Sequence, residues 1–167
     1  SRVANSIYWL SRYMERAEKV SRFIHVNLQM MLDLPSGSNQ QWRPLVSISG
    51  DDSVFTSRYA TATRENVIKF LALDMENPNS IVSCLRAARE NSRTVREAIS
   101  SEMWEQVNTS YLAINAAASN PLLIHSPYSF FNEVKKASQL FDGVAEATML
   151  RGEGWHFVVF VAVEAIV

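Results

Sequence analysis

The chain has 167 residues, a formal net charge of −1 and one cysteine. A chain of this length suits one domain, and it buries about 68–70% of its unfolded surface, so its core requires neither a metal nor a disulfide. The small net charge argues against general attraction to nucleic acid or to anionic membranes, and the single cysteine excludes an intrachain disulfide.

Arginine dominates the basic residues, with 12 Arg among the 16 Lys and Arg. Because Arg pairs with carboxylates and phosphates through two parallel hydrogen bonds, this excess favours specific pairing over mere solubility. A single cysteine that forms no intrachain disulfide is typical of proteins in the reducing cytoplasm, so we expect a cytoplasmic protein. The chain begins without a methionine and ends within an apolar run, so we expect residues 1–167 to be a single helical domain that is a truncated or N-terminal part of a longer protein.

Residues 3–32 predict one long amphipathic helix. Apolar side chains recur there every three or four residues, and at about 1.5 Å per residue such a helix is about 45 Å long. The predicted buried seam consists of Val3, Ile7, Leu10, Met14, Ala17, Ile24, Leu28 and Met31, with Ser21 completing the spacing.

Shorter helical segments follow. We expect them at residues 42–49, 53–59, 64–75 and 81–100, then from the bend at 100–101 to about 118, and from 127 onward. Asp51 or Asp52, Thr63, Ser80 and Ser126 are the expected N-caps. The apolar tail, residues 154–167, is rich in β-branched residues, but a lone strand would have no partner, so we predict a buried helix there. The fold class is all-α, a bundle of about six to eight helices with a long N-terminal helix.

Two of these helices carry a charged stripe beside the apolar seam. At about 100° per residue, one stripe of the first helix contains Arg12, Glu15, Arg16, Glu18, Lys19 and Arg22, and one flank of the helix at 81–100 contains Arg86, Arg89, Glu90, Arg93, Arg96 and Glu97. If the two helices are neighbours, Arg12 and Glu15 are placed to form interhelical ion pairs with Glu90 and Arg93. The alternative is that pairs within each helix solvate its surface, each contributing about 0.2–0.5 kcal/mol.

Other candidate sites are weaker. Helical bundles can hold a pair of metals with carboxylates and two Glu-x-x-His motifs, but only Glu153 and His156 form such a motif, so we expect no metal and no cofactor. Cys84 lies on an apolar seam and is predicted to be buried and inert. Asn108 lies between Trp104 and Tyr111 on one helical stripe and needs a polar partner if it is buried.

Three segments resemble a known family. "SRVANSIYWLSRYMERAE" (residues 1–18), "RAARENSRTVREAISSEMWEQVNTSYL" (86–112) and "GVAEATMLRGEGWHF" (143–157) are similar to the signatures of the bacterial alpha-E domain family, which is all-helical and named for a Glu-Arg motif. Glu15-Arg16 occupies that motif here. Members carry a second Glu-Arg motif after a Trp-x-Phe signature, whereas here Glu164 is followed by alanine.

The resemblance implies a cellular context and no defined reaction. Members of the family are commonly encoded beside, or fused to, an ATP-grasp ligase-like protein and a transglutaminase-like protein, which are the implied partners. We therefore expect a helical component of a bacterial system that forms or modifies peptide or amide bonds. It would act mainly through protein contacts. Anionic ligands that bind to the Arg/Glu stripes are further candidate partners.

Two alternatives remain open. One is an enzyme in which Glu15 acts as acid or base and arginines hold a carboxylate or phosphate. The other is a purely structural or oligomerising bundle, including a homo-oligomer. The candidate residues for a polar network or ligand site are Arg12, Glu15, Arg16, Arg86, Glu90, Arg93, Glu97 and Asn108. We expect neither nucleic acid nor a membrane among the partners.

Overall fold

The structure is a computed structural model that describes residues 2–32 and 42–148. These residues form seven α-helices and one π-helical turn, and they contain no strand. The all-α prediction is confirmed, including the long first helix, α1 (Arg2–Leu32). Residues 154–167, for which a buried helix was predicted, lie outside the described ranges.

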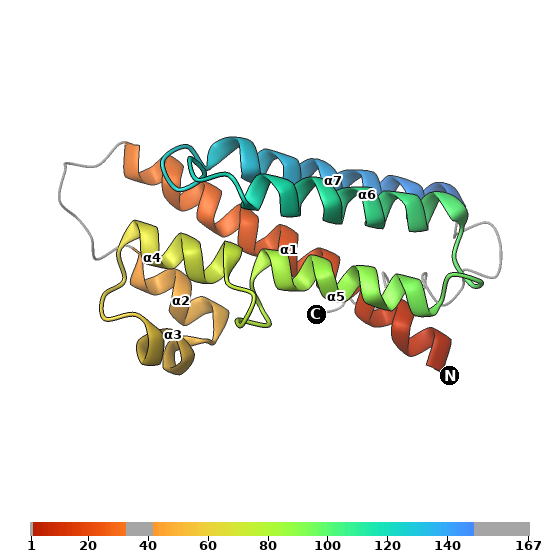
Figure 1. The fold of residues 1–167 in the computed structure, drawn as a ribbon, viewed down its shortest axis with the longest axis horizontal. Helices are drawn as coiled ribbons and strands as arrows, with labels where there is room; N and C mark the ends of the chain where they lie inside the picture. Colours follow the sequence, from red (N-terminus) through yellow and green to blue (C-terminus); the bar gives the residue numbers. More distant parts are fainter. Residues whose placement is uncertain (1, 33–41, 149–167) are drawn as a thin grey trace.

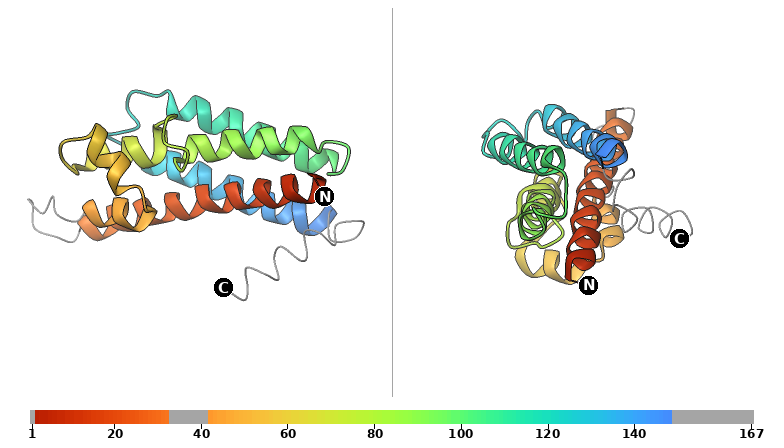
Figure 2. Two further views of the ribbon diagram at one scale, coloured as in Figure 1. Left: turned by 90° about the horizontal axis from the view of Figure 1, so that it is seen from below. Right: turned by 90° about the vertical axis from the view of Figure 1, so that its right-hand side faces the viewer.

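Four long helices form the body of the molecule. They are α1, α5 (Ile81–Thr94), α6 (Ser101–Ala118) and α7 (Tyr128–Thr148). Each contacts two others, since α1 packs on α5 and α7 while α6 packs on the same two helices. Neighbours run antiparallel, and the end-on view shows the four axes around a common core (Figures 1 and 2).

Burial of the α1 seam follows the predicted spacing. Side chains from Ile7 to Leu28 at intervals of three or four residues are buried, including Ser21, whose hydroxyl donates to the Phe131 carbonyl at 3.4 Å. Val3 was predicted to be buried, but it is 40% exposed. Within the described ranges, none of the helices combines the length and apolar character needed to cross a membrane.

Three short helices cover one end of the bundle (Figure 1). They are α2 (Arg43–Ser49), α3 (Asp52–Arg58) and α4 (Arg64–Ile68). Trp42, which precedes α2, is 1% exposed and is among the largest fully buried side chains of the described residues. Gly50 ends α2 in the left-handed region, with φ of +78°, a conformation that favours glycine.

The helix predicted at residues 64–75 is shorter and changes form. Thr63 caps it as expected, since its hydroxyl accepts from the Asn66 amide at 3.2 Å. After Ile68 the chain widens into a π-helical turn, η2 (Lys69–Leu73), which ends with the Asp74 amide donating to the Lys69 carbonyl at 2.9 Å. The central residues of this turn, 70–72, are all buried.

The prediction that α5 continues to residue 100 is wrong. The helix ends at Thr94, and residues 95–99 form a turn. The hydroxyls of Ser92 and Thr94 donate to carbonyls three residues earlier, at 2.8 Å each, and so compete with continued backbone bonding at the helix end. Arg96 and Glu97 therefore lie in the turn and not on the helical stripe.

Buried polar contacts shape the connection between η2 and α5. Asn77 is 1% exposed, and its side-chain amide donates to the Phe70 carbonyl at 3.0 Å, while its oxygen accepts from the Asn79 backbone amide at 3.0 Å. Ser80 caps α5 by accepting from the Ser83 amide at 3.2 Å, and its hydroxyl donates to the Asp74 carbonyl at 2.6 Å. These bonds fix residues 77–80 against the bundle.

We expect Asn77→Ala to lower the free energy of unfolding by about 1–3 kcal/mol, because it leaves a buried carbonyl without its donor. Asn115→Ala, at an exposed position of α6, is the matched control and should change stability by less than about 0.5 kcal/mol. Urea denaturation of both variants measures the difference, and equal effects would contradict the role assigned to Asn77.

Candidate functional site

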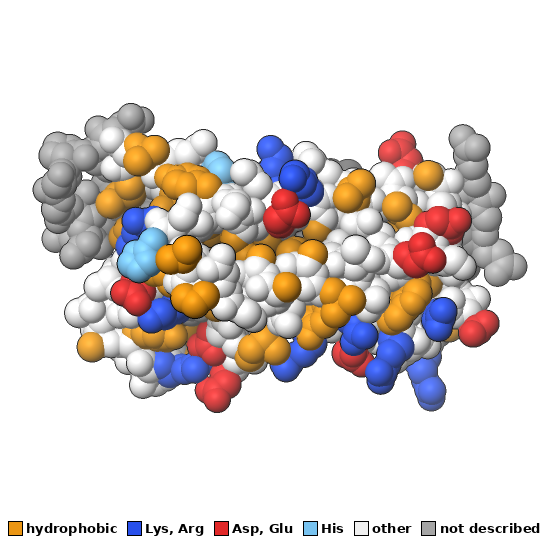
Figure 3. Space-filling view, turned by 45° about the horizontal axis from the view of Figure 1, so that its top comes forward, with side chains coloured by type: hydrophobic (Ala, Val, Ile, Leu, Met, Phe, Trp, Pro, Cys, Tyr) orange, Lys and Arg blue, Asp and Glu red, His pale blue; other side chains and the backbone are white. Residues whose placement is uncertain are grey.

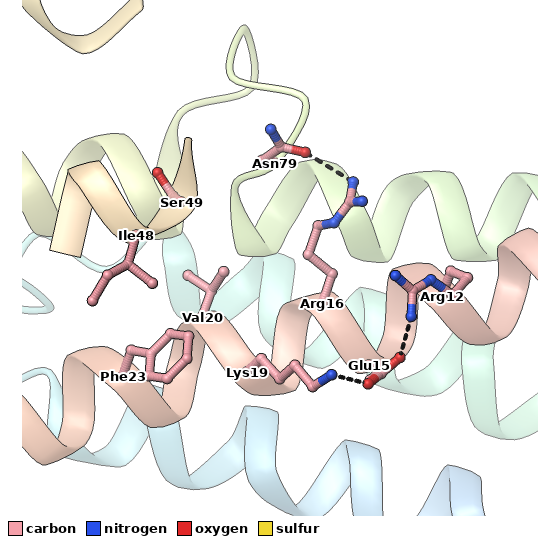
Figure 4. Close-up of a pocket in the computed structure, with 9 residues that line it drawn as sticks. All are labelled: Arg12, Glu15, Arg16, Lys19, Val20, Phe23, Ile48, Ser49 and Asn79. Atoms are coloured by element: carbon pink, nitrogen blue, oxygen red, sulfur yellow. Dashed lines mark hydrogen bonds and ion pairs between the residues drawn. The ribbon is translucent and has the colours of Figure 1, made fainter. Parts of the chain in front are cut away.

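A surface pocket of about 250 Å³ lies along the middle of α1, where α2 ends and residues 77–80 approach (Figure 4). It brings together three cations and one carboxylate, so its lining carries a net charge of +2. The residues that line it are Arg12, Glu15, Arg16, Lys19, Val20, Phe23, Ile48, Ser49 and Asn79.

Arg16 is held at the pocket by a neutral amide. Its Nη1 donates to the Asn79 side-chain oxygen at 2.8 Å. The amide nitrogen of Asn79 in turn donates to both carboxylate oxygens of Asp51, at 2.9 and 3.2 Å. Asp51 precedes α3 as predicted, but its side chain makes no capping bond. Asp51 therefore orients the side chain of Asn79, and Asn79 in turn orients the guanidinium of Arg16.

Glu15 binds two cations of its own helix. The Arg12 guanidinium contacts it at 3.0 Å, and Lys19 also pairs with it. These i,i+3 and i,i+4 contacts hold the three side chains along one side of the pocket. Glu15 and Arg16 thus both line the pocket but have different partners.

The other end of the pocket is apolar. Val20, Phe23 and Ile48 gather there, away from the guanidinium of Arg12 (Figure 4). Phe23 and Ile48 are largely exposed although they are apolar. The pocket therefore presents cations at one end and hydrocarbon at the other, an arrangement that suits an amphipathic anion.

The second predicted stripe does not reach this pocket. Arg89 of α5 faces α6, where its Nε donates to the Asn108 side-chain oxygen at 2.7 Å and its guanidinium lies 5.1 Å from the centre of the Tyr111 ring. Asn108 thus has the polar partner that its position required. Arg93 pairs with Glu90 at 3.3 Å.

The remaining charges of that stripe are exposed: Arg86 on α5, and Arg96 and Glu97 in the turn that follows. On the face seen in Figure 3, Lys and Arg side chains gather with acidic ones along one edge of the molecule. None of these three side chains lines the pocket on α1.

The two stripes do not pair with each other. Although α1 and α5 are neighbours, no ion pair joins Arg12 or Glu15 to Glu90 or Arg93 among the described residues. Arg12 pairs with Glu15 within α1, and Arg93 pairs with Glu90 within α5. The predicted ion pairs between the two helices are therefore wrong. The pocket lies on the side of α1 that borders α2, and α5 directs Arg89 toward α6.

Sequence reasoning did not include Ile48, Ser49 and Asn79 among the candidates. All three come from connections or short helices that only the tertiary fold brings to α1. Asn79 directly precedes the α5 cap, Ser80, and no local signal distinguishes it from an ordinary loop residue.

Cys84 is buried, as predicted, and its Sγ donates to the Pro78 carbonyl at 3.7 Å. Burial raises the pKa of this thiol to about 12, so it is protonated at neutral pH and unsuited to act as a nucleophile. Across residues 2–32 and 42–148, no three His, Cys, Asp or Glu side chains converge to hold a metal. Glu153 and His156 lie outside these ranges.

Comparison with known families gives a match that covers most of the chain. A family model described as a predicted alpha-helical domain with a conserved ER motif covers residues 1–160. The dipeptide Glu-Arg occurs once in the sequence, at residues 15–16, so the motif coincides with two residues of the pocket. Searches of curated proteins and of solved structures found no match.

Asp142 of α7 lies near two acidic residues of α1, Glu18 and Glu15. Partial desolvation raises the pKa of its carboxyl although the residue is exposed, and the negative charges of Glu18 and Glu15 raise it further. A carboxyl whose pKa is raised by folding binds its proton more tightly in the folded chain. The free energy of unfolding therefore falls as pH rises from the ordinary value of 3.8 through the folded value.

We expect Asp142→Asn to be more stable than the parent at pH 7, with a gain that shrinks as the pH is lowered toward 4. Urea denaturation at both pH values measures this, since urea does not screen charges. Glu146→Gln removes a negative charge one turn further along α7 and serves as the control. A gain for Asp142→Asn that is equal at both pH values would contradict the assignment.

Proposed function

The chain belongs to the Alpha-E family, and on that premise we propose that it is a binding component of a bacterial system that forms or modifies peptide or amide bonds. In this role it holds a carboxylate-bearing ligand in the α1 pocket and contacts the proteins that carry out the chemistry. The proposal includes a cytoplasmic location and an ATP-grasp ligase-like and a transglutaminase-like protein as partners.

The observation that carries the proposal is the position of the Glu-Arg motif at a pocket with a net charge of +2. Arg16 is oriented by Asn79, while its remaining N–H groups are suited to a carboxylate through paired hydrogen bonds. A system that joins amide bonds uses a carboxylate as one reactant, so a component that retains this group has a direct use.

The pocket supports binding better than catalysis. Glu15, the acid or base of the enzymatic alternative, already accepts from Arg12 and Lys19, which suits it to positioning these cations. The volume of about 250 Å³ lies just below the range of about 300–1,000 Å³ that is typical for drug-sized ligands. It therefore suits the end of a chain rather than a complete nucleotide cofactor.

A purely structural role is the second candidate, and the α5 stripe favours it. Arg89 is bound to Asn108 and stacked on Tyr111, so its charge serves helix packing. If the same holds for α1, the pocket cations would only set the approach of α2 and of residues 77–80. The two roles differ in what they predict for Arg16.

We expect acetyl-alanine, a small free carboxylate, to shift the amide resonances of residues around the pocket in an NMR titration, and acetyl-alanine amide to shift them far less. Arg16→Gln should weaken binding by about tenfold or more, because a hydrogen bond to a charged group contributes about 1.5–3 kcal/mol. Arg22→Gln, on the same helix but paired with Glu18 outside the pocket, is the control. Equal binding by a well-folded Arg16→Gln variant would favour the structural role.

The partner claim has its own test. The chain should co-purify with an ATP-grasp ligase-like protein of the same organism, and Arg22→Gln should co-purify to the same extent. If no complex forms at micromolar concentrations of both proteins, the proposed membership of a ligation system fails, whatever the result of the titration.

A further inference from the structure

An exposed apolar strip continues from the pocket along α1. It consists of Phe23, Val26 and Met30 on α1 and Ile48 on α2, with side chains 48%, 45%, 56% and 67% exposed, respectively. The three α1 residues follow the spacing i, i+3, i+7, which places them on one helical face. Contiguous apolar surface of this kind commonly marks an interaction site.

The strip and the cations form one continuous track. Phe23 and Ile48 belong both to the strip and to the pocket lining, and Lys19 lies one helical turn before Phe23. From Lys19 to Met30 the helix rises about 16 Å, at about 1.5 Å per residue. An extended peptide covers this distance with about five residues, at about 3.3 Å each.

We propose that this track binds the C-terminal end of a peptide with apolar side chains, with its terminal carboxylate at Arg16 and Lys19 and the preceding residues lying toward Met30. The inference rests on the proposed function, because it identifies the ligand of the same pocket. It adds the direction of the chain, its apolar character and a length of about five residues.

The apolar surface beside the cations favours a carboxylate that is attached to hydrocarbon over a bare phosphate ion. The pocket has a net charge of +2, but one of its lining residues is the Glu15 carboxylate. This net charge would attract a doubly charged phosphate more strongly than a carboxylate at the same distance, but inorganic phosphate has no hydrocarbon to place on Phe23 and Ile48. The planar guanidinium of Arg16 can pair with two oxygens of either group, so the apolar contact makes the distinction.

The apolar strip accounts for selectivity that the cations cannot provide. Each CH₂ group that a ligand buries on such a surface contributes about 0.8 kcal/mol, or about fourfold in affinity. Two leucine side chains seated on the strip would therefore raise affinity well above that of a small carboxylate. Serine side chains in the same positions would not.

The test uses the full chain and a capped five-residue peptide of alternating leucine and alanine that ends in leucine with a free carboxylate. We expect it to bind at least tenfold more tightly than its C-terminal amide, than the same peptide with serine in place of leucine, and than acetyl-alanine. Inorganic phosphate should compete more weakly than acetyl-alanine. Fluorescence anisotropy of a labelled peptide, with the label on its N-terminal cap, gives these ratios.

Two variants locate the binding. Phe23→Ser should lose most of the preference for leucine over serine yet retain acetyl-alanine binding, and because Phe23 is exposed, the variant should fold. Leu140→Ser, at an exposed position of α7, is the matched control and should behave like the parent.

Leucine and serine peptides that bind equally, or phosphate that competes better than acetyl-alanine, would overturn this inference while carboxylate binding stands. If acetyl-alanine itself fails to bind, the proposed function fails as well. A leucine preference that survives in Phe23→Ser would place the apolar contact elsewhere and would also overturn the inference.

Discussion

The candidate site depends on the burial of one side of α1 between α5 and α7. Nine residues of α1 from Ser6 to Leu28 are buried, at the spacing of a regular helix, and this leaves one long face of the helix directed away from the bundle. Because the seam is continuous, the opposite face is also continuous. The pocket cations and the α1 residues of the apolar strip therefore lie along one face of one helix, at fixed distances from each other.

The same geometry separates the two residues of the Glu-Arg motif. Adjacent residues on a helix differ in direction by about 100°, so Glu15 and Arg16 point in different directions although both line the pocket. Glu15 lies on the side of α7, near enough to Asp142 to raise the pKa of that carboxyl. Arg16 turns to Asn79 at the start of α5. The dipeptide thus places a carboxylate and a guanidinium side by side along the pocket, each held by different partners.

Local chemistry made several features predictable. Thr63 and Ser80 could be assigned as caps because a hydroxyl directly before a helix accepts a backbone amide at any site of this kind. The end of α5 was missed because Ser92 and Thr94 are tolerated in a helix, and only their observed bonds to carbonyls distinguish an end from a continuation. The partner of Arg89 was missed in a similar way, since its charge pattern equally allowed a contact to α1 or to α6.

The sequence by itself determined the all-α class, the buried seam of α1 and the positions of the charges on each helix, because these follow from helical periodicity and side-chain chemistry alone. Only the tertiary structure decided which charges meet. Asp51, Asn79 and Arg16 are separated by 28 and 63 residues along the chain, and no local preference selects contacts over such distances. They come together because packing of the short helices and the buried bonds of Asn77 fix the loop against α1.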